Sequence, residues 1–312
     1  MPKNGPWGGG NIFLNAFVKK CYKFGLQPIF SMTDTCTTIF CLDPRQSEFG
    51  IHYGHLASYK RTKKSVKIFQ RVGDLGTHGK PEIINMLKGC VDTDCFIFPS
   101  NWAKNYFNYN VFSVDSKNSI VIDNGADNLY FDNRNVKDCF ASDDIIKLVT
   151  HHWSDNVRKG FSFYKQINNF FNSNECHDFF GINVDFTYIG RKPENIIFNN
   201  YISPLDSGQL SICLPKYDLY VTASEEEAGA NHVLEAQACG LPVMYKTGGG
   251  SIKDYCSNYG GIEYDNFYDF LNKLKDVINN FLFYKNKVLL YNNNVDNVVD
   301  NYLEVISSFN ED

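Results

Sequence analysis

The chain has 312 residues, of which 43% are hydrophobic and 15% aromatic, enough for more than one packed core. Its net charge is −5, and no block of Lys or Arg is long enough to follow a phosphate backbone, which disfavours nucleic acid as a main partner. The ten cysteines lack metal-ligand spacing and no apolar run reaches about 18 residues, so we expect a cytoplasmic protein without zinc, a disulfide framework or a transmembrane segment.

Short apolar runs of strand character alternate with longer stretches of helical spacing in both halves of the chain. This alternation implies parallel sheets with crossover helices, and its presence in both halves predicts two doubly wound, Rossmann-like α/β domains. In chain order, the predicted strands are 26–32, 40–42, 66–72, 95–100, 119–125, 144–153, 184–190, 196–202, 217–224 and 241–247. The predicted helices are 11–22, 80–87, 161–171, 207–214, 231–239, 265–281 and 295–309.

The boundary between the two domains is predicted in the polar stretch 131–143, which has neither the strand period nor the helix period. We therefore expect a first domain over 1–140 and a second over 141–290. Residues 291–312 form a last helix with apolar residues at helical spacing, such as Val295 and Val299. Because that face must be buried, we expect the helix to cross back onto the first domain.

A strand, a polar bend and a helix follow one another over residues 217–240. The backbone amides at the start of this helix, from Gly229 through Asn231 to His232, are expected to point into the crevice at the carboxyl end of the strand. Unpaired N–H groups and the helix dipole favour a diphosphate at such a place. The pattern therefore predicts an anion-binding helix start.

Two carboxylates lie on either side of this helix start. Glu235 is about one turn inside the helix, where it can accept hydrogen bonds from vicinal hydroxyls such as those of a ribose. Glu227 lies on the bend and can face whatever is attached beyond the phosphates. The alternative is an ordinary acidic surface loop followed by a helix with one more acid, because single motifs often match by chance.

The order of these residues adds a resemblance to a known family. Glu227, seven intervening residues, Glu235 and then "AQACGLPV" resemble the donor-binding signature of retaining glycosyltransferases of the GT-B fold, in particular the family 4 type. The stretch "THHWSDNVRKGF" is similar to the segment that opens the second domain of that family, where basic residues hold the donor diphosphate. Arg158 and Lys159 occupy that place. An Arg that the family often has before the Lys-Gly pair is not found here, and Arg158 or Arg191 is the alternative for it.

The first half resembles the same family. "GPWGGGNIFLNAF" looks like its first glycine-rich loop, which lies close to the phosphates and here contains Gly9 and Gly10. His78 follows a predicted strand, where the family often has a His that contacts the donor sugar; the alternative is a loop His that caps the helix starting at Pro81. Asp74 is expected either to serve acceptor binding or to form an Asx turn.

The resemblance implies a GT-B fold, with two Rossmann-like domains facing a central cleft, and a retaining transfer of a hexose or similar sugar. The donor would be a nucleotide-diphosphate sugar and the acceptor a glycan or lipid-linked sugar, with no metal or other cofactor. Glu227, His78 and Lys159 would be catalytic, and Glu235 would bind the ribose. Two alternatives stay open: a nucleotide-sugar epimerase or phosphorylase, and a nucleotide-sugar-binding protein without turnover.

Overall fold

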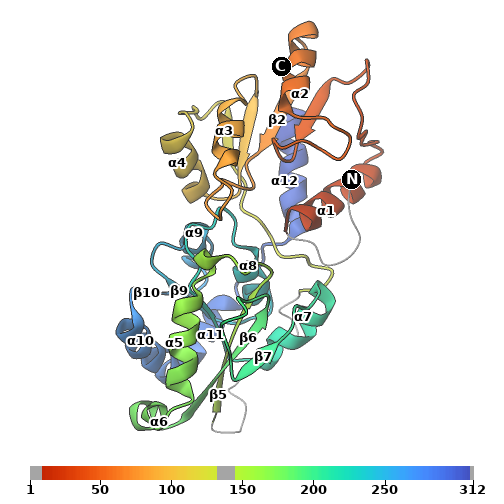
Figure 1. Cartoon of the computed structure of the whole chain (residues 1–312). Helices are drawn as coiled ribbons and strands as arrows, with labels where there is room; N and C mark the ends of the chain where they lie inside the picture. Colours follow the sequence, from red (N-terminus) through yellow and green to blue (C-terminus); the bar gives the residue numbers. More distant parts are fainter. Residues whose placement is uncertain (1–8, 132–144, 310–312) are drawn as a thin grey trace. The chain divides into compact units, whose positions relative to one another are not determined.

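The computed structural model describes residues 9–131 and 145–309. The chain divides into two compact units, unit 1 with Met1–Gly125 and Asn293–Asp312, and unit 2 with Ala126–Asn292. Each unit is an α/β structure built on one sheet in which all strand pairs are parallel (Figure 1). The predicted fold class of two α/β domains with parallel sheets is therefore confirmed.

The sheet of unit 1 has four strands in the order β1-β2-β3-β4. Its helices cover both faces: α1 and α12 pack on one face around Phe69 and Ile97, and α4 packs on the other, where Phe107 contacts Phe96. The elements of unit 1 are α1 (Gly9–Lys23), β1 (Thr38–Cys41), α2 (Tyr53–Thr62), β2 (Lys67–Arg71), α3 (Glu82–Lys88), β3 (Cys95–Phe98), α4 (Asn101–Asn110), β4 (Ser119–Val121) and α12 (Val295–Ser308).

The last helix, α12, belongs to unit 1 although the chain reaches it only after completing unit 2. Its apolar face, with Val299 and Tyr302 fully buried, lies against α1, and the ring centroids of Tyr302 and Phe13 are 4.7 Å apart. Within the described ranges 9–131 and 145–309, no helix has both the length and the apolar character that a membrane crossing requires.

Two sequence predictions in unit 1 are corrected. Residues 26–32, predicted as a strand, lie outside both sheets; Pro28 has no backbone N–H to give to a ladder, and the edge strand is β1. Gly9 and Gly10, predicted to lie in a loop, belong to helix α1 (Gly9–Lys23). The predicted elements omit α2 and α4 of unit 1. In unit 2 they omit α6 (Asn174–Phe180), α9 (Ser251–Cys256), α11 (Phe281–Val288) and the short strand β10 (Ile262–Tyr264).

The sheet of unit 2 has six strands in the order β10-β9-β8-β5-β6-β7. Side chains of β8 alternate between the two faces, with Leu219 and Val221 in one core and Tyr220 in the other, so both faces are covered. The elements of unit 2 are β5 (Ile145–His152), α5 (Phe161–Phe171), α6 (Asn174–Phe180), β6 (Asn183–Gly190), β7 (Asn200–Ile202), α7 (Ser207–Cys213), β8 (Leu219–Thr222), α8 (Asn231–Ala238), β9 (Val243–Lys246), α9 (Ser251–Cys256), β10 (Ile262–Tyr264), α10 (Phe267–Asn279) and α11 (Phe281–Val288).

The chain order of unit 2 reverses between β5 and β8. From β5 the sheet grows through β6 to β7, and from β8 it grows the other way through β9 to β10. Ligands of open parallel sheets bind at the carboxyl ends of the strands beside such a switch point. The loops that follow β5 and β8 are therefore the first places to look for a site.

The predicted domain boundary near residue 140 falls within 132–144, outside the described residues. In the described chain, unit 2 begins at Ala126. Ala126 and Phe131 are both buried in the core that lies under α8 and α9, which ties the stretch before the predicted boundary to unit 2.

Candidate functional site

Three loops at the carboxyl ends of β5, β8 and β9 are joined through their backbones. The amide of Glu225, after β8, donates to the carbonyl of Arg158, after β5, at 2.9 Å. The carbonyl of Glu227 accepts from the amide of Ser251, after β9, at 2.8 Å. These hydrogen bonds fix the bend that carries Glu227 relative to the loop that carries Lys159.

Glycines allow the three loops to approach each other this closely. Gly160 has φ +86°, and a Cβ there would lie 2.4 Å from the carbonyl oxygen of Ala223. Gly250 has φ +71°, and its Cβ would lie 2.5 Å from the carbonyl oxygen of Glu227. Glu226 has φ +51°, a conformation that non-glycine residues rarely adopt. The bend therefore stores backbone strain next to the two carboxylates singled out from the sequence.

Lys159 and Glu227 form a largely buried ion pair at this junction. Lys159 Nζ lies 2.5 Å from Glu227 Oε1, and the side chains are 13% and 11% exposed. The two residues are 68 positions apart in the chain and meet because β5 and β8 are neighbours in the sheet. The two preceding glutamates form more exposed ion pairs, Glu226 with Arg158 at 2.5 Å and Glu225 with Lys246 at 2.6 Å.

Helix α8 starts beside this ion pair. Its N-cap is Ala230, whose methyl group cannot accept a hydrogen bond, so the first turn has no side-chain cap from that residue. Two of the amides expected to face a ligand are engaged inside the protein: Ala230 donates to Ser251 Oγ at 3.0 Å, and Asn231 donates to the carbonyl of Gly229 at 3.0 Å. These two amides are therefore directed at acceptors within the protein, and the dipole of α8 still favours an anion at its start.

Glu235 has a partner that the sequence did not reveal. Its Oε2 lies 2.8 Å from Nε2 of His151 at the end of β5, with the side chains 14% and 8% exposed. His151 thus holds the carboxylate on the side of the sheet covered by α8. No local motif signals this pairing, because it depends on β5 and α8 being adjacent in the fold.

His232 faces inward from the first turn of α8. It is buried, its Nε2 lies 3.2 Å from Thr222 Oγ1, and its ring centroid is 4.9 Å from that of His152. His152 in turn contacts the hydroxyl of Tyr164 at 2.8 Å. Burial raises the pKa of Tyr164 to about 12, and its hydroxyl oxygen also accepts from the amide of Ala223 at 2.9 Å. These buried contacts join β5, α5, β8 and α8 beneath the candidate site.

Arg158 and Arg191 are the alternatives for the Arg that the family often has before the Lys-Gly pair. Both side chains have partners in the structure. Arg158 pairs with Glu226, and the Arg191 guanidinium carbon lies 4.4 Å from the ring centroid of Trp153. Arg191 directly follows β6, the strand beside β5, so it lies at the same edge of the sheet as the residues after β5. Stacking on Trp153 keeps its planar cation oriented.

Gly9, Gly10 and His78 are placed in unit 1. His78 lies in the turn between β2 and α3. Asp74 forms an Asx turn there, accepting from the amide of Gly76 at 2.9 Å, and also pairs with Lys80. Helix α3 follows Pro81, whose side chain makes no capping hydrogen bond. Both interpretations of His78, contact with the donor sugar and capping of α3, stay predictions.

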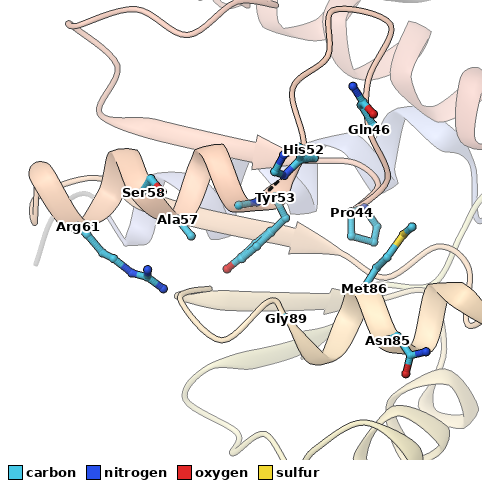
Figure 2. Close-up of a pocket in the computed structure, with 11 residues that line it drawn as sticks. Pro44, Gln46, His52, Tyr53, Ala57, Ser58, Arg61, Asn85, Met86 and Gly89 are labelled. Atoms are coloured by element: carbon cyan, nitrogen blue, oxygen red, sulfur yellow. Dashed lines mark hydrogen bonds between the residues drawn. The ribbon is translucent and has the colours of Figure 1, made fainter.

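Unit 1 also has a surface pocket of about 630 Å3 between α2 and α3, lined by Tyr53, Arg61 and Asn85 among others (Figure 2). His52 lies at the edge of this pocket, and its Nδ1 accepts a hydrogen bond from the amide of Gly54 at 3.2 Å (Figure 2). This hydrogen bond caps the start of α2. The guanidinium of Arg61 is bonded to Asp92 at 2.7 Å. The pocket contains none of the site residues predicted from the sequence.

No protein-family model matches the sequence, and the comparison with curated proteins gives no match. Solved structures match almost the whole chain. HepE of Anabaena in complex with UDP-glucose superposes with a TM-score of 0.66 at 14% identity, covering 98% of each chain. WaaG, a glycosyltransferase of lipopolysaccharide biosynthesis, gives 0.64 at 12% identity and 98% of each chain. Sucrose-phosphate synthase of Thermosynechococcus elongatus gives 0.62 at 13% identity, covering 95% of this chain and 77% of that one.

The chain has the GT-B fold. The predicted fold is thereby confirmed, with β5 to β10 as the second of the two sheets. Identities of 12–14% establish the GT-B fold alone, so membership of the family 4 type stays a prediction.

Proposed function

We propose that this GT-B protein is a metal-independent, retaining glycosyltransferase that moves a hexose or similar sugar from a nucleoside diphosphate to a hydroxyl of an acceptor glycan or glycolipid. The observation that carries the proposal is the Lys159–Glu227 ion pair at the carboxyl ends of β5 and β8, beside the switch point of the sheet. A cation for phosphate and a carboxylate for sugar hydroxyls are there brought within one site.

Transfer requires that charge building on the leaving diphosphate be stabilised. Lys159 and Arg158, now paired with Glu227 and Glu226, and the dipole of α8 are the positive groups that would stabilise this charge once the diphosphate is bound. Lys159 is paired with Glu227 before the donor arrives. When a diphosphate binds Lys159, the Glu227 carboxylate becomes the acceptor for donor-sugar hydroxyls and fixes the orientation of the sugar.

In the retaining step, the acceptor hydroxyl oxygen forms a bond to the anomeric carbon on the face from which the diphosphate departs. The bond between that carbon and the β-phosphate oxygen breaks, and this oxygen takes the proton of the acceptor hydroxyl. Atoms and charges balance without a protein nucleophile. His78 of unit 1 is proposed to contact the donor sugar, and Gly9 and Gly10 to lie close to the phosphates.

A thermal-shift panel of UDP, GDP and ADP sugars tests donor binding, because a ligand of the native state raises its apparent stability. Radiolabelled transfer in EDTA then tests turnover and metal independence, and NMR of the product anomeric proton tests retention. Inverted product, or activity lost in EDTA and restored by a divalent cation, contradicts the mechanism. Tight donor binding without turnover favours the nucleotide-sugar-binding alternative.

Replacing Glu235 with Gln is expected to weaken binding of the matching nucleoside diphosphate by roughly tenfold to a hundredfold, because hydrogen bonds between a carboxylate and the ribose hydroxyls are lost. His151→Ala is expected to act in the same direction, since Glu235 loses the contact that orients it. Isothermal titration with ribose and 2′-deoxyribose nucleotides measures both effects.

Glu263→Gln is the matched control, because this carboxylate pairs with Lys253 at the surface and is expected to leave binding unchanged. If Glu235→Gln keeps the full preference for ribose over 2′-deoxyribose, Glu235 does not bind the ribose.

A further inference from the structure

The end of α1 and the loop after it expose an unusual concentration of large apolar side chains. We call residues 19–32 the apolar-basic segment. Of the 21 exposed large hydrophobic residues in the described chain, five lie in this segment, with exposed fractions from 36% to 61%. They are Tyr22, Phe24, Leu26, Ile29 and Met32. Single exposed hydrophobic residues are ordinary, but a cluster of this kind marks an interaction surface.

The backbone holds this segment at both ends. Gly25, with φ +75°, ends α1 in a Schellman motif: Leu26 donates to the carbonyl of Cys21 at 2.9 Å, and Gly25 to that of Tyr22 at 3.0 Å. Further along, the hydroxyl of Tyr59 in α2 donates to the carbonyl of Thr33 at 2.8 Å. The apolar side chains are therefore presented by an anchored loop.

A cavity adjoins the segment. It has a volume of about 660 Å3, and its apolar lining comes from Ile29 and Met32 of the segment and from Leu56 of α2. The lining also includes Asp43 and Arg45, which form an ion pair with each other. A volume in this range accommodates a small ligand or part of an acyl chain. The exposed apolar surface thus continues into a cavity whose lining is in part apolar.

The charge of the segment is entirely basic. Residues 1–33 contain no Asp or Glu, whereas the whole chain has a net charge of −5. Lys20 is paired with Asp300 of α12 at 2.8 Å, and Lys19 and Lys23 are exposed one turn apart on α1. Lysines beside exposed aromatic and aliphatic residues match a surface with an apolar interior and anionic headgroups.

We propose that the apolar-basic segment docks unit 1 on a lipid bilayer that contains anionic lipids. Phe24, Leu26 and Ile29 enter the boundary between headgroups and acyl chains, while Lys19 and Lys23 contact the phosphates. Two features favour lipid over a second copy of this chain: the excess of positive charge and the adjoining cavity of acyl-chain size. The docking is independent of the proposed sugar transfer.

Sedimentation of the full chain with vesicles tests this docking. Vesicles of phosphatidylcholine with about a quarter phosphatidylglycerol are expected to bind it more tightly than phosphatidylcholine alone. Each lysine contributes roughly fivefold near an anionic surface, so Lys19→Glu/Lys23→Glu should weaken binding at least about 25-fold and erase the preference for anionic vesicles. Phe24→Ser/Ile29→Ser should weaken binding to both kinds of vesicle.

The control is Leu282→Ser/Phe283→Ser in α11, where the two side chains are 61% and 58% exposed and carry no proposed role. It should bind vesicles as the unchanged chain does, and circular dichroism should show all variants folded. Absence of vesicle binding, or equal weakening by the control, overturns the proposal. So does a concentration-dependent dimer, seen by light scattering, that Phe24→Ser/Ile29→Ser abolishes while vesicle binding persists.

Discussion

Replacing Lys159 with methionine is expected to lower sugar transfer by roughly a hundredfold to a thousandfold, because the leaving diphosphate loses a preorganised cation. The same change should destabilise the folded chain. Glu227 is only 11% exposed, and without Lys159 its carboxylate is left without that ammonium. The expected loss is about 3 kcal/mol, at the lower end for a broken buried pair since both side chains keep some contact with water. Urea denaturation and radiolabelled transfer measure the two effects.

The double variant Lys159→Met/Glu227→Gln separates stability from activity. Removing both charges should restore most of the stability and none of the transfer, because the diphosphate still lacks its cation. Lys246→Met is the matched control, since its pair with Glu225 is 32% and 41% exposed and is worth less than about 1 kcal/mol. A Lys159→Met protein that transfers sugar within tenfold of the unchanged chain would remove Lys159 from the mechanism.

The sequence was sufficient for the fold because hydrophobic periodicity reports burial on both faces of a parallel sheet. The strand β8 reads as a continuous apolar run, and each of its residues is buried. The same apolar pattern led to a wrong strand prediction at residues 26–32. This apolar run contains Pro28, lies outside the sheets and is partly exposed. An apolar run predicts that a surface prefers an apolar contact, and it does not say whether that contact is the core or another partner.

The candidate site was predictable only where its parts lie close together in the sequence. Glu227 and Glu235 were found because one bend and one helix carry both. The contact of Glu235 with His151 depends on the position of β5 beside β8, which no local pattern specifies. The amides of Ala230 and Asn231 were expected to face a ligand, yet they find acceptors in Ser251 and Gly229.

Replacing Gly250 with alanine is expected to displace the bend that carries Glu227. The residue has φ +71° and ψ −126°, a conformation that suits glycine and costs an alanine about 1–3 kcal/mol. In addition, the new Cβ would lie 2.5 Å from the carbonyl oxygen and 2.7 Å from the amide nitrogen of Glu227, and neither backbone atom can move without the loop. We expect a further loss of roughly 1–3 kcal/mol, as for overpacking, and a drop of more than tenfold in nucleoside-diphosphate affinity.

Gly248→Ala is the control that isolates the clash from the strain. Gly248 also has a positive φ, +85°, but a Cβ there meets nothing within 4 Å. This variant should lose only the strain of a positive φ, about 1–3 kcal/mol, and should bind the nucleotide normally. Urea denaturation and titration calorimetry on the two variants give the comparison. If both lose affinity equally, the conformation of the glycine loop matters to the site, and the position of Glu227 against Gly250 does not.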